Sequence, residues 1–217
     1  MLITSMNHEA WGDTLVVITA QDDINHPQTF TQNDDVVRIF EQDTNKTVGY
    51  NFFNINHYMH DIDKNGHVIL NEDQVNALND QLTIAGFTDK LQADTKPKFV
   101  VGYVKTCEPH PDSDHMHVCM VDVGNNQTLQ IVCGAPNIEQ GQKVVVALVG
   151  AMMPTGAIIW PGKLRGVESD GMICSARELA LPHAPQKRGI LVLPNDWKTG
   201  SAFDFNKGDK VVVSQNN

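Results

Sequence analysis

Short apolar runs, separated by turns rich in glycine, proline and asparagine, fill most of the second half of this chain. The strand candidates are Phe99–Lys105, Met116–Val123, Leu129–Cys133, Val144–Val149, Gly171–Cys174 and Ile190–Leu193. In the third run, Leu129, Ile131 and Cys133 share one side of a strand. Gln130 points to the other side, which is the alternation of a half-buried strand. Strands of this length and spacing are typical of a small antiparallel barrel, so an all-β domain is predicted here.

The first half predicts a different kind of domain, a small α+β unit. Asn71 and Gln74 form a capping-box pattern, and apolar residues follow at the spacing of a helix, which predicts a helix over Glu72–Ala85. Gly86 ends it. The strand candidates are β-branched and aromatic runs: Leu15–Ala20, Val36–Glu41 and Thr47–Ile55.

Between the two halves, Thr88–Lys98 is polar, contains a proline and has no period, which predicts a linker. At 217 residues the chain is long enough for two modest domains, each with its own core. We therefore expect an acidic α+β domain at residues 1–92, a β-domain at 93–205 and a C-terminal tail at 206–217.

The charge is distributed unevenly over these domains. The net charge of −10 argues against a nucleic-acid partner for the chain as a whole. Residues 1–95, however, hold 15 Asp or Glu and 4 Lys or Arg (−11), whereas residues 96–217 hold 11 and 12 (+1). The two halves are therefore expected to have different partners, and the acidic one would either contact a protein partner or orient the β-domain by repelling a polyanion from one side. Its cations, Arg38, Lys46, Lys64 and Lys90, are scattered in sequence and predict no continuous cationic surface.

Several features predict a cytoplasmic protein without cofactors. The first residues lack the basic region and apolar core of a secretory signal. The longest apolar run, Val144–Met153, is about half of what a bilayer requires. The four cysteines lie far apart, without a CxxC pair, so neither a zinc knuckle nor a disulfide framework is indicated.

The second half also carries a family resemblance. Its segments are HPDSDHMHVCMVDVG (His110–Gly124), QIVCGAPNI (Gln130–Ile138), KLRGVESDGMICSARELAL (Lys163–Leu181) and GILVLP (Gly189–Pro194). In this order they resemble the tRNA-binding domain shared by the bacterial phenylalanyl-tRNA synthetase beta chain, the C-terminal module of methionyl-tRNA synthetases and the endothelial monocyte-activating polypeptide family. With its acidic extension, the whole chain resembles the YtpR-type stand-alone tRNA-binding proteins. The resemblance implies an OB-fold, binding to the backbone and shape of tRNA, and no catalysis.

Phosphate contact requires long cationic side chains on a shared surface. Lys163 and Arg165 lie two residues apart, so in an extended segment both would project to one side. Asn137 would either contact a phosphate or sugar or stabilise a turn. Tyr103 and Trp160 would either stack on a base or, as the favoured expectation, be buried in the barrel or its rim. The predicted RNA-binding residues are Lys163, Arg165, Arg177, Lys187, Arg188 and Asn137. The alternative is a solvated surface on which Glu168, Asp170 and Glu178 pair with these cations.

Two other functions remain open at this point. Five potential metal ligands lie within eight residues, which would suit a metal-dependent hydrolase: His110, Asp112, Asp114, His115 and His117. No second cluster with ligand spacing accompanies them, and Asp and His are expected in a turn for local hydrogen bonding, so no metal is expected. The other alternative is a chaperone-like or scaffolding protein that uses the same β-domain. A homodimer is a further expectation, because related free-standing domains are often dimers.

Overall fold

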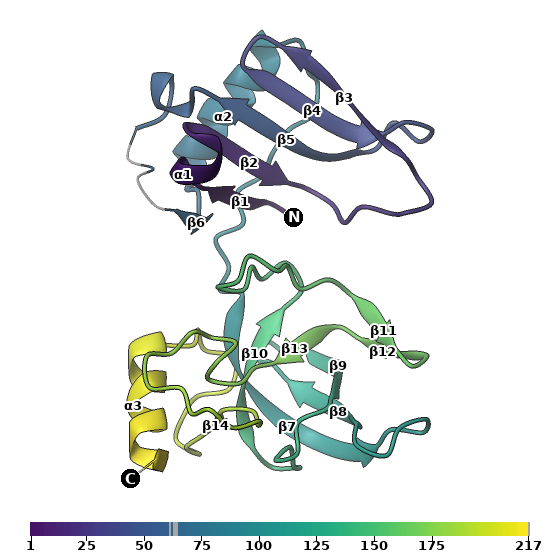
Figure 1. Cartoon of the computed structure of the whole chain (residues 1–217), viewed down its shortest axis with the longest axis vertical. Helices are drawn as coiled ribbons and strands as arrows, with labels where there is room; N and C mark the ends of the chain where they lie inside the picture. The colour runs from purple at the N-terminus through teal and green to yellow at the C-terminus, as the bar shows by residue number, and fades with distance from the viewer. Residues whose placement is uncertain (61, 63–64, 217) are drawn as a thin grey trace. The chain divides into compact units, whose positions relative to one another are not determined.

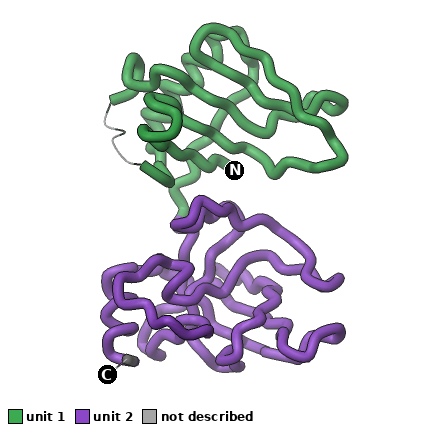
Figure 2. Tube along the Cα trace, viewed as in Figure 1, with its two compact units in different colours: residues 1–96 green, residues 97–217 purple. Residues whose placement is uncertain are grey.

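The computed structural model describes residues 1–60, 62 and 65–216. The chain forms two compact units, Met1–Lys96 (unit 1) and Pro97–Asn217 (unit 2), coloured separately in Figure 2. The division falls after Lys96, four residues beyond the expected one. No helix among the described residues has the length and apolar character needed to cross a bilayer.

Unit 1 is a six-stranded antiparallel sheet with a helix on one face (Figure 1). The strands, in the order β3-β4-β5-β2-β1-β6, are Gln28–Asn33, Val36–Glu41, Thr47–Phe53, Thr14–Ile18, Ile3–Met6 and Gly66–Val68. Beside them lie the short helix α1 (His8–Trp11), a 3-10 turn (Ile55–His57) and α2 (Glu72–Ile84). Leu78 and Leu82 of α2 pack against Tyr50 and Phe52 of β5 in one buried core.

The capping box predicted for α2 is confirmed. The Asn71 side chain accepts a bond from the Gln74 amide at 2.9 Å, and the Gln74 side chain accepts one from the Asn71 amide at 3.0 Å. Two of the donors that a helix start leaves unpaired are thereby satisfied.

Unit 2 is built on a curved antiparallel sheet in the order β13-β10-β7-β8-β9, with β14 also paired to β10. In chain order the strands are β7 (Phe99–Pro109), β8 (His117–Asp122), β9 (Thr128–Cys133), β10 (Lys143–Leu148), β13 (Gly171–Ile173) and β14 (Val192–Leu193). A separate hairpin, β11 (Gly162–Leu164) and β12 (Val167–Ser169), precedes β13.

Strand β7 is long enough to serve two partners. Its first half pairs with β10 and its second half with β8, with an irregularity between Val104 and Thr106 where the register shifts. Such a bulge bends a strand and increases its twist. At the other side of the sheet β13 lies beside β9, and the Asp170 amide donates to the Gln130 carbonyl at 2.8 Å. The two end strands of the sheet therefore meet.

The residues expected to form a C-terminal tail are helical. Helix α3 (Phe205–Asn216) buries Val212 in the core that contains Leu179 and Leu191, and its Gln215 side chain donates to the Val192 carbonyl at 2.8 Å. Gly208 permits this close packing, because a Cβ there would lie 2.2 Å from the Phe203 ring. The helix is thus part of the folded unit.

Candidate nucleic-acid interface

The segment after β13 positions the first of the predicted cations. The Glu178 amide donates to Ser175 Oγ at 3.2 Å, and the Ser175 amide donates to Glu178 Oε2 at 2.7 Å. These reciprocal bonds fix a tight turn on which Arg177 lies exposed. The Glu178 carboxylate accepts this bond from the Ser175 backbone and, within the described part of the chain, forms no ion pair with the neighbouring Arg177.

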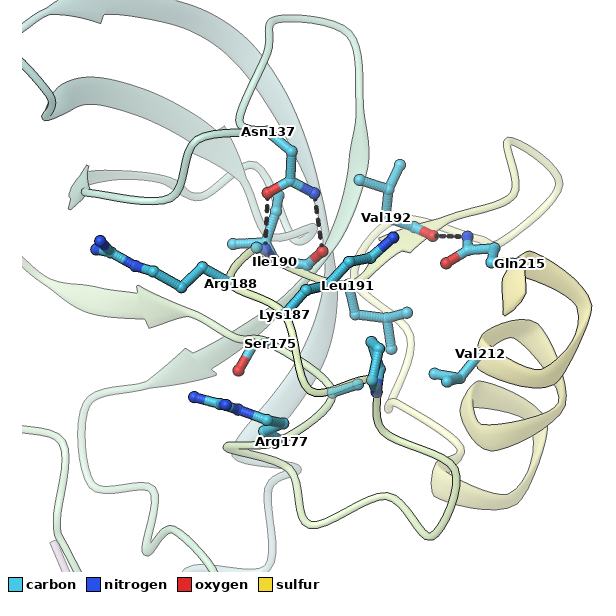
Figure 3. Close-up of a pocket in the computed structure, with 13 residues that line it drawn as sticks. Asn137, Ser175, Arg177, Lys187, Arg188, Ile190, Leu191, Val192, Val212 and Gln215 are labelled. Atoms are coloured by element: carbon cyan, nitrogen blue, oxygen red, sulfur yellow. Dashed lines mark hydrogen bonds between the residues drawn. The ribbon is translucent and has the colours of Figure 1, made fainter. Parts of the chain in front are cut away.

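The loop that carries Lys187 and Arg188 is fixed by an amide from a distant part of the chain. Asn137 Nδ2 donates to the Ile190 carbonyl at 3.1 Å, and the Ile190 amide donates to Asn137 Oδ1 at 2.8 Å (Figure 3). Gly189 lies against this side chain with φ +142°, and a Cβ there would come within 2.9 Å of Asn137 Oδ1. Asn137 therefore uses both side-chain atoms to hold the loop.

These two segments bring three cations together. Arg177, Lys187 and Arg188 all line the pocket of Figure 3, where Arg177 and Arg188 extend to one side and Lys187 extends to the other. All three side chains are exposed. Among the residues that the structure describes, no carboxylate pairs with any of them. The result is an unneutralised cationic site.

The hairpin places the other two predicted cations differently. Lys163 lies on β11 and pairs with Glu168 of β12 at 3.4 Å, with both side chains about two-thirds exposed (65% and 67%). Arg165 lies in the two-residue turn, with φ +45°, and its Nη1 donates to the Asp112 carbonyl at 2.8 Å. The expectation that the two residues share an extended segment is wrong at Arg165. The tight hairpin requires left-handed backbone at both Arg165 and Gly166.

Three of the five potential metal ligands, His110, Asp114 and His115, are engaged in local bonds, whereas the buried Nδ1 of His117 has no hydrogen-bond partner among the described residues. His110 is 3% exposed; its Nδ1 accepts from the Asp112 amide and its Nε2 donates to the Leu164 carbonyl, each at 3.0 Å. His115 pairs with Asp114 at 2.7 Å, and this bond holds the pKa of Asp114 below its ordinary value. Within the described part of the chain, no group of three or more His, Cys, Asp or Glu is placed to hold a metal ion.

A larger hollow adjoins the pocket of Figure 3 and is lined by the same three cations. Its volume is ≈ 690 Å³, within the range of about 300–1,000 Å³ common for ligand sites. Its apolar wall includes Trp160, Met172 and Leu164, of which Leu164 is 43% exposed. We call this hollow the hairpin groove, because the hairpin residues Gly162 and Leu164 form part of its wall.

Three cations of unit 1 also meet at one pocket. Arg38, Lys46 and Lys90, scattered in sequence, line a single pocket; Lys64 lies outside the described residues. Strand pairing places Arg38 opposite Tyr50, and the segment after α2 brings in Asp89 and Lys90.

The charges of this pocket are largely satisfied within it. Arg38 donates to the Thr47 hydroxyl and to two acceptors of Asn45, and it lies 3.6 Å from Asp89. Lys46 pairs at 3.1 Å with the buried Glu41.

Comparison with known proteins gives the chain a family. Residues 99–202 match a domain described as "Putative tRNA binding domain", and residues 23–94 match a domain of unknown function. The "Putative tRNA-binding protein YtpR" of Bacillus subtilis (strain 168) is 52% identical over 199 residues, covering 92% of this chain and 98% of that protein. The chain belongs to the YtpR family. Other relatives match over a shorter part of this chain.

Those relatives are phenylalanine–tRNA ligase beta subunits. The one from Lactiplantibacillus plantarum is 51% identical over 121 residues, which is 54% of this chain and 15% of that subunit. The one from Oceanobacillus iheyensis is 55% identical over 118 residues, which is 52% of this chain and 14% of that subunit. The YtpR-family chain thus spans about one-seventh of the length of these subunits.

Proposed function

We propose that this protein binds tRNA through unit 2 and catalyses no reaction. The name of the Bacillus subtilis relative and the domain match over residues 99–202 support tRNA as the ligand. The single observation that carries the site is the unneutralised trio of Arg177, Lys187 and Arg188. Exposed cations without carboxylate partners favour a polyanion, because their charge is available to phosphate.

We further propose that unit 2 is an OB-fold. Support comes from its topology: a long, bulged first strand pairs with two neighbours, and the end strands β13 and β9 lie side by side. A five-stranded, partly open Greek-key barrel has these features, and its loops commonly bind oligonucleotides.

In this proposal the cations contact phosphates and carry no sequence information. Arg177, Lys187 and Arg188 make the principal contacts. Lys163 and Arg165 contribute less, since each already has a protein partner. Asn137 acts by holding the loop and does not touch RNA.

The surroundings of Ser175 and of three cysteines support the absence of catalysis. Ser175 Oγ accepts a bond from the Glu178 amide. Burial raises the pKa of the Cys174 thiol to about 12 and raises the pKa values of Cys119 and Cys133 as well, so these thiols are not activated.

Filter binding with purified bulk tRNA across a salt series tests the proposal. If about three to five phosphates are neutralised, log K should fall against log salt with a slope of roughly −2 to −4.5. Duplex DNA of equal phosphate count should bind more weakly, because the site is proposed to follow the shape of folded RNA. Absence of tRNA binding at low salt would falsify the proposal.

A further inference from the structure

The apolar wall of the hairpin groove has no role in an interface that contacts phosphate alone. Trp160 is half-buried, Leu164 is exposed, and both face the hollow that Arg177, Lys187 and Arg188 also line. A double helix offers phosphates and grooves, but its base faces are stacked inside. An apolar wall beside unpaired cations therefore fits a ligand that exposes an aromatic ring and a phosphate together.

The wall is held in place by backbone bonds. The Gly150 amide donates to the Ile159 carbonyl at 2.8 Å and the Ile159 amide to the Ala151 carbonyl at 2.9 Å, which fixes the segment that ends at Trp160. Leu164 is held through its carbonyl, which accepts the bond from the buried His110. A preformed apolar surface loses little conformational entropy when a ligand packs on it.

We propose that the hairpin groove binds an unpaired RNA segment, with one or two bases against Trp160 and Leu164 and their phosphates at Arg177, Lys187 and Arg188. The inference rests on the proposed function and specifies which part of the RNA enters the site. Base stacking on aromatic side chains is tolerant of sequence, because every base has a π-face. The cations decide between RNA and an extended polypeptide, since an apolar peptide would leave all three charges unmatched at the edge of the groove.

The experiment uses the full-length protein and fluorescently labelled bulk tRNA, with competition by hexa-adenylate and by a blunt RNA duplex of equal phosphate count. Hexa-adenylate should displace tRNA at a concentration about tenfold or more below that required of the duplex. Equal competition by the two, with tRNA binding intact, overturns the inference and leaves the proposed function standing. If tRNA itself does not bind, the proposed function fails. Direct titration with hexa-adenylate then tests whether the hairpin groove binds an unpaired RNA segment.

Substitutions in the wall supply a second measurement. Trp160→Ala and Leu164→Ala should each weaken hexa-adenylate binding about 5- to 100-fold with an unchanged salt slope, because no charge is removed. Trp160→Phe should restore most of the affinity, and Trp11→Ala in unit 1, a more exposed tryptophan, is the control. Leu164→Ala keeps the test valid if Trp160→Ala does not fold. The inference is overturned if the wall variants bind hexa-adenylate as tightly as the parent protein does. It is also overturned if an unfolded polypeptide displaces tRNA better than hexa-adenylate does.

Discussion

The two units treat their cations in opposite ways. In unit 1, Arg38 and Lys46 lie against the carboxylates of Asp89 and Glu41, and Arg38 also stacks 4.4 Å above the Phe40 ring. Lys90 donates to the Thr83 hydroxyl. In unit 2, the cations of the groove have no carboxylate partner among the described residues: Arg177, Lys187 and Arg188.

Both units therefore contain a pocket lined by three Lys or Arg residues. Two of the three in unit 1 pair with carboxylates, whereas among the described residues none of the three in unit 2 does. A count of cations does not distinguish the two pockets. The partner of each cation does distinguish them, because a cation already paired with a carboxylate inside the protein gains little from contact with a phosphate. The comparison implies that mutations in unit 2 should affect RNA affinity and mutations in unit 1 should affect stability.

The largest expected effect is on RNA affinity in unit 2. Replacing Arg177, Lys187 and Arg188 together by alanine should weaken tRNA binding on the order of 1,000-fold or more at low salt, since three charge-assisted contacts of at least about 1.5 kcal/mol each sum to about 4.5 kcal/mol. The salt slope should become shallower by about 2–3.

The control for this variant removes the same charge elsewhere, by Lys90→Ala, Lys96→Ala and Lys207→Ala. It should lower affinity far less. If the two triple variants lose affinity equally, only net charge matters and the comparison between the pockets is wrong.

In unit 1 the expected effect is on stability. Arg38→Ala removes three hydrogen bonds and leaves Asp89 without its cation, which should lower the free energy of unfolding by about 2–4 kcal/mol. RNA affinity should not change. Urea unfolding and filter binding on the same sample measure both quantities, and a loss of affinity in a folded Arg38→Ala protein would contradict the prediction.

The same pocket predicts a pH dependence of stability. Partial burial acts to raise the pKa of Asp89, but bonds from Thr47 and Tyr50 together with Arg38 outweigh it and lower the pKa below its ordinary value. The stabilisation is thus present above the ordinary carboxyl pKa and is lost as the pH falls through the lowered one. The melting temperature of Asp89→Asn should lie below that of the parent at neutral pH, and the difference should shrink in acid. A constant difference from neutral pH to pH 3 would exclude this linkage.

Local patterns were predictable from the sequence, and long-range pairing was not. The α2 capping box lies within four residues, and strand β4 has the predicted bounds Val36–Glu41. Helix α3 was missed because Gly208 and the β-branched run Val211–Val213 disfavour a helix, and only packing against the core stabilises it.

The candidate site shows the same division. Its residue types were predicted as cations near glycine and proline. Their arrangement depends on the bond between Asn137 and Ile190, which lie 53 residues apart, and on the hairpin turn that redirects Arg165. No spacing rule within one segment contains that information.

The Asn137 bonds give a prediction of intermediate size. Asn137→Ala should release the loop that carries Lys187 and Arg188 and weaken tRNA binding about 3- to 10-fold, because the cations must then be ordered on binding. The salt slope should stay the same, as no charge is lost. A shallower slope would mean that Lys187 or Arg188 loses its phosphate contact when the loop is released.

The smallest expected effect comes from removing unit 1 altogether. Met1–Lys96 carries 15 Asp or Glu and 5 Lys or Arg, a net charge of −10, so it should repel a polyanion over about one Debye length, ~10 Å at 0.1 M salt. Unit 2 has its own buried cores, so Pro97–Asn217 should fold alone, which circular dichroism can verify. Its tRNA affinity should equal that of the full chain or exceed it by about twofold, with the gain largest at low salt, where screening is weakest. Arg38, Lys46 and Lys90 already have partners within unit 1, so their removal should cost no phosphate contact. A clear loss of affinity in the folded fragment would show that Lys90 and its neighbours bind RNA, and that internal pairing does not separate the two pockets.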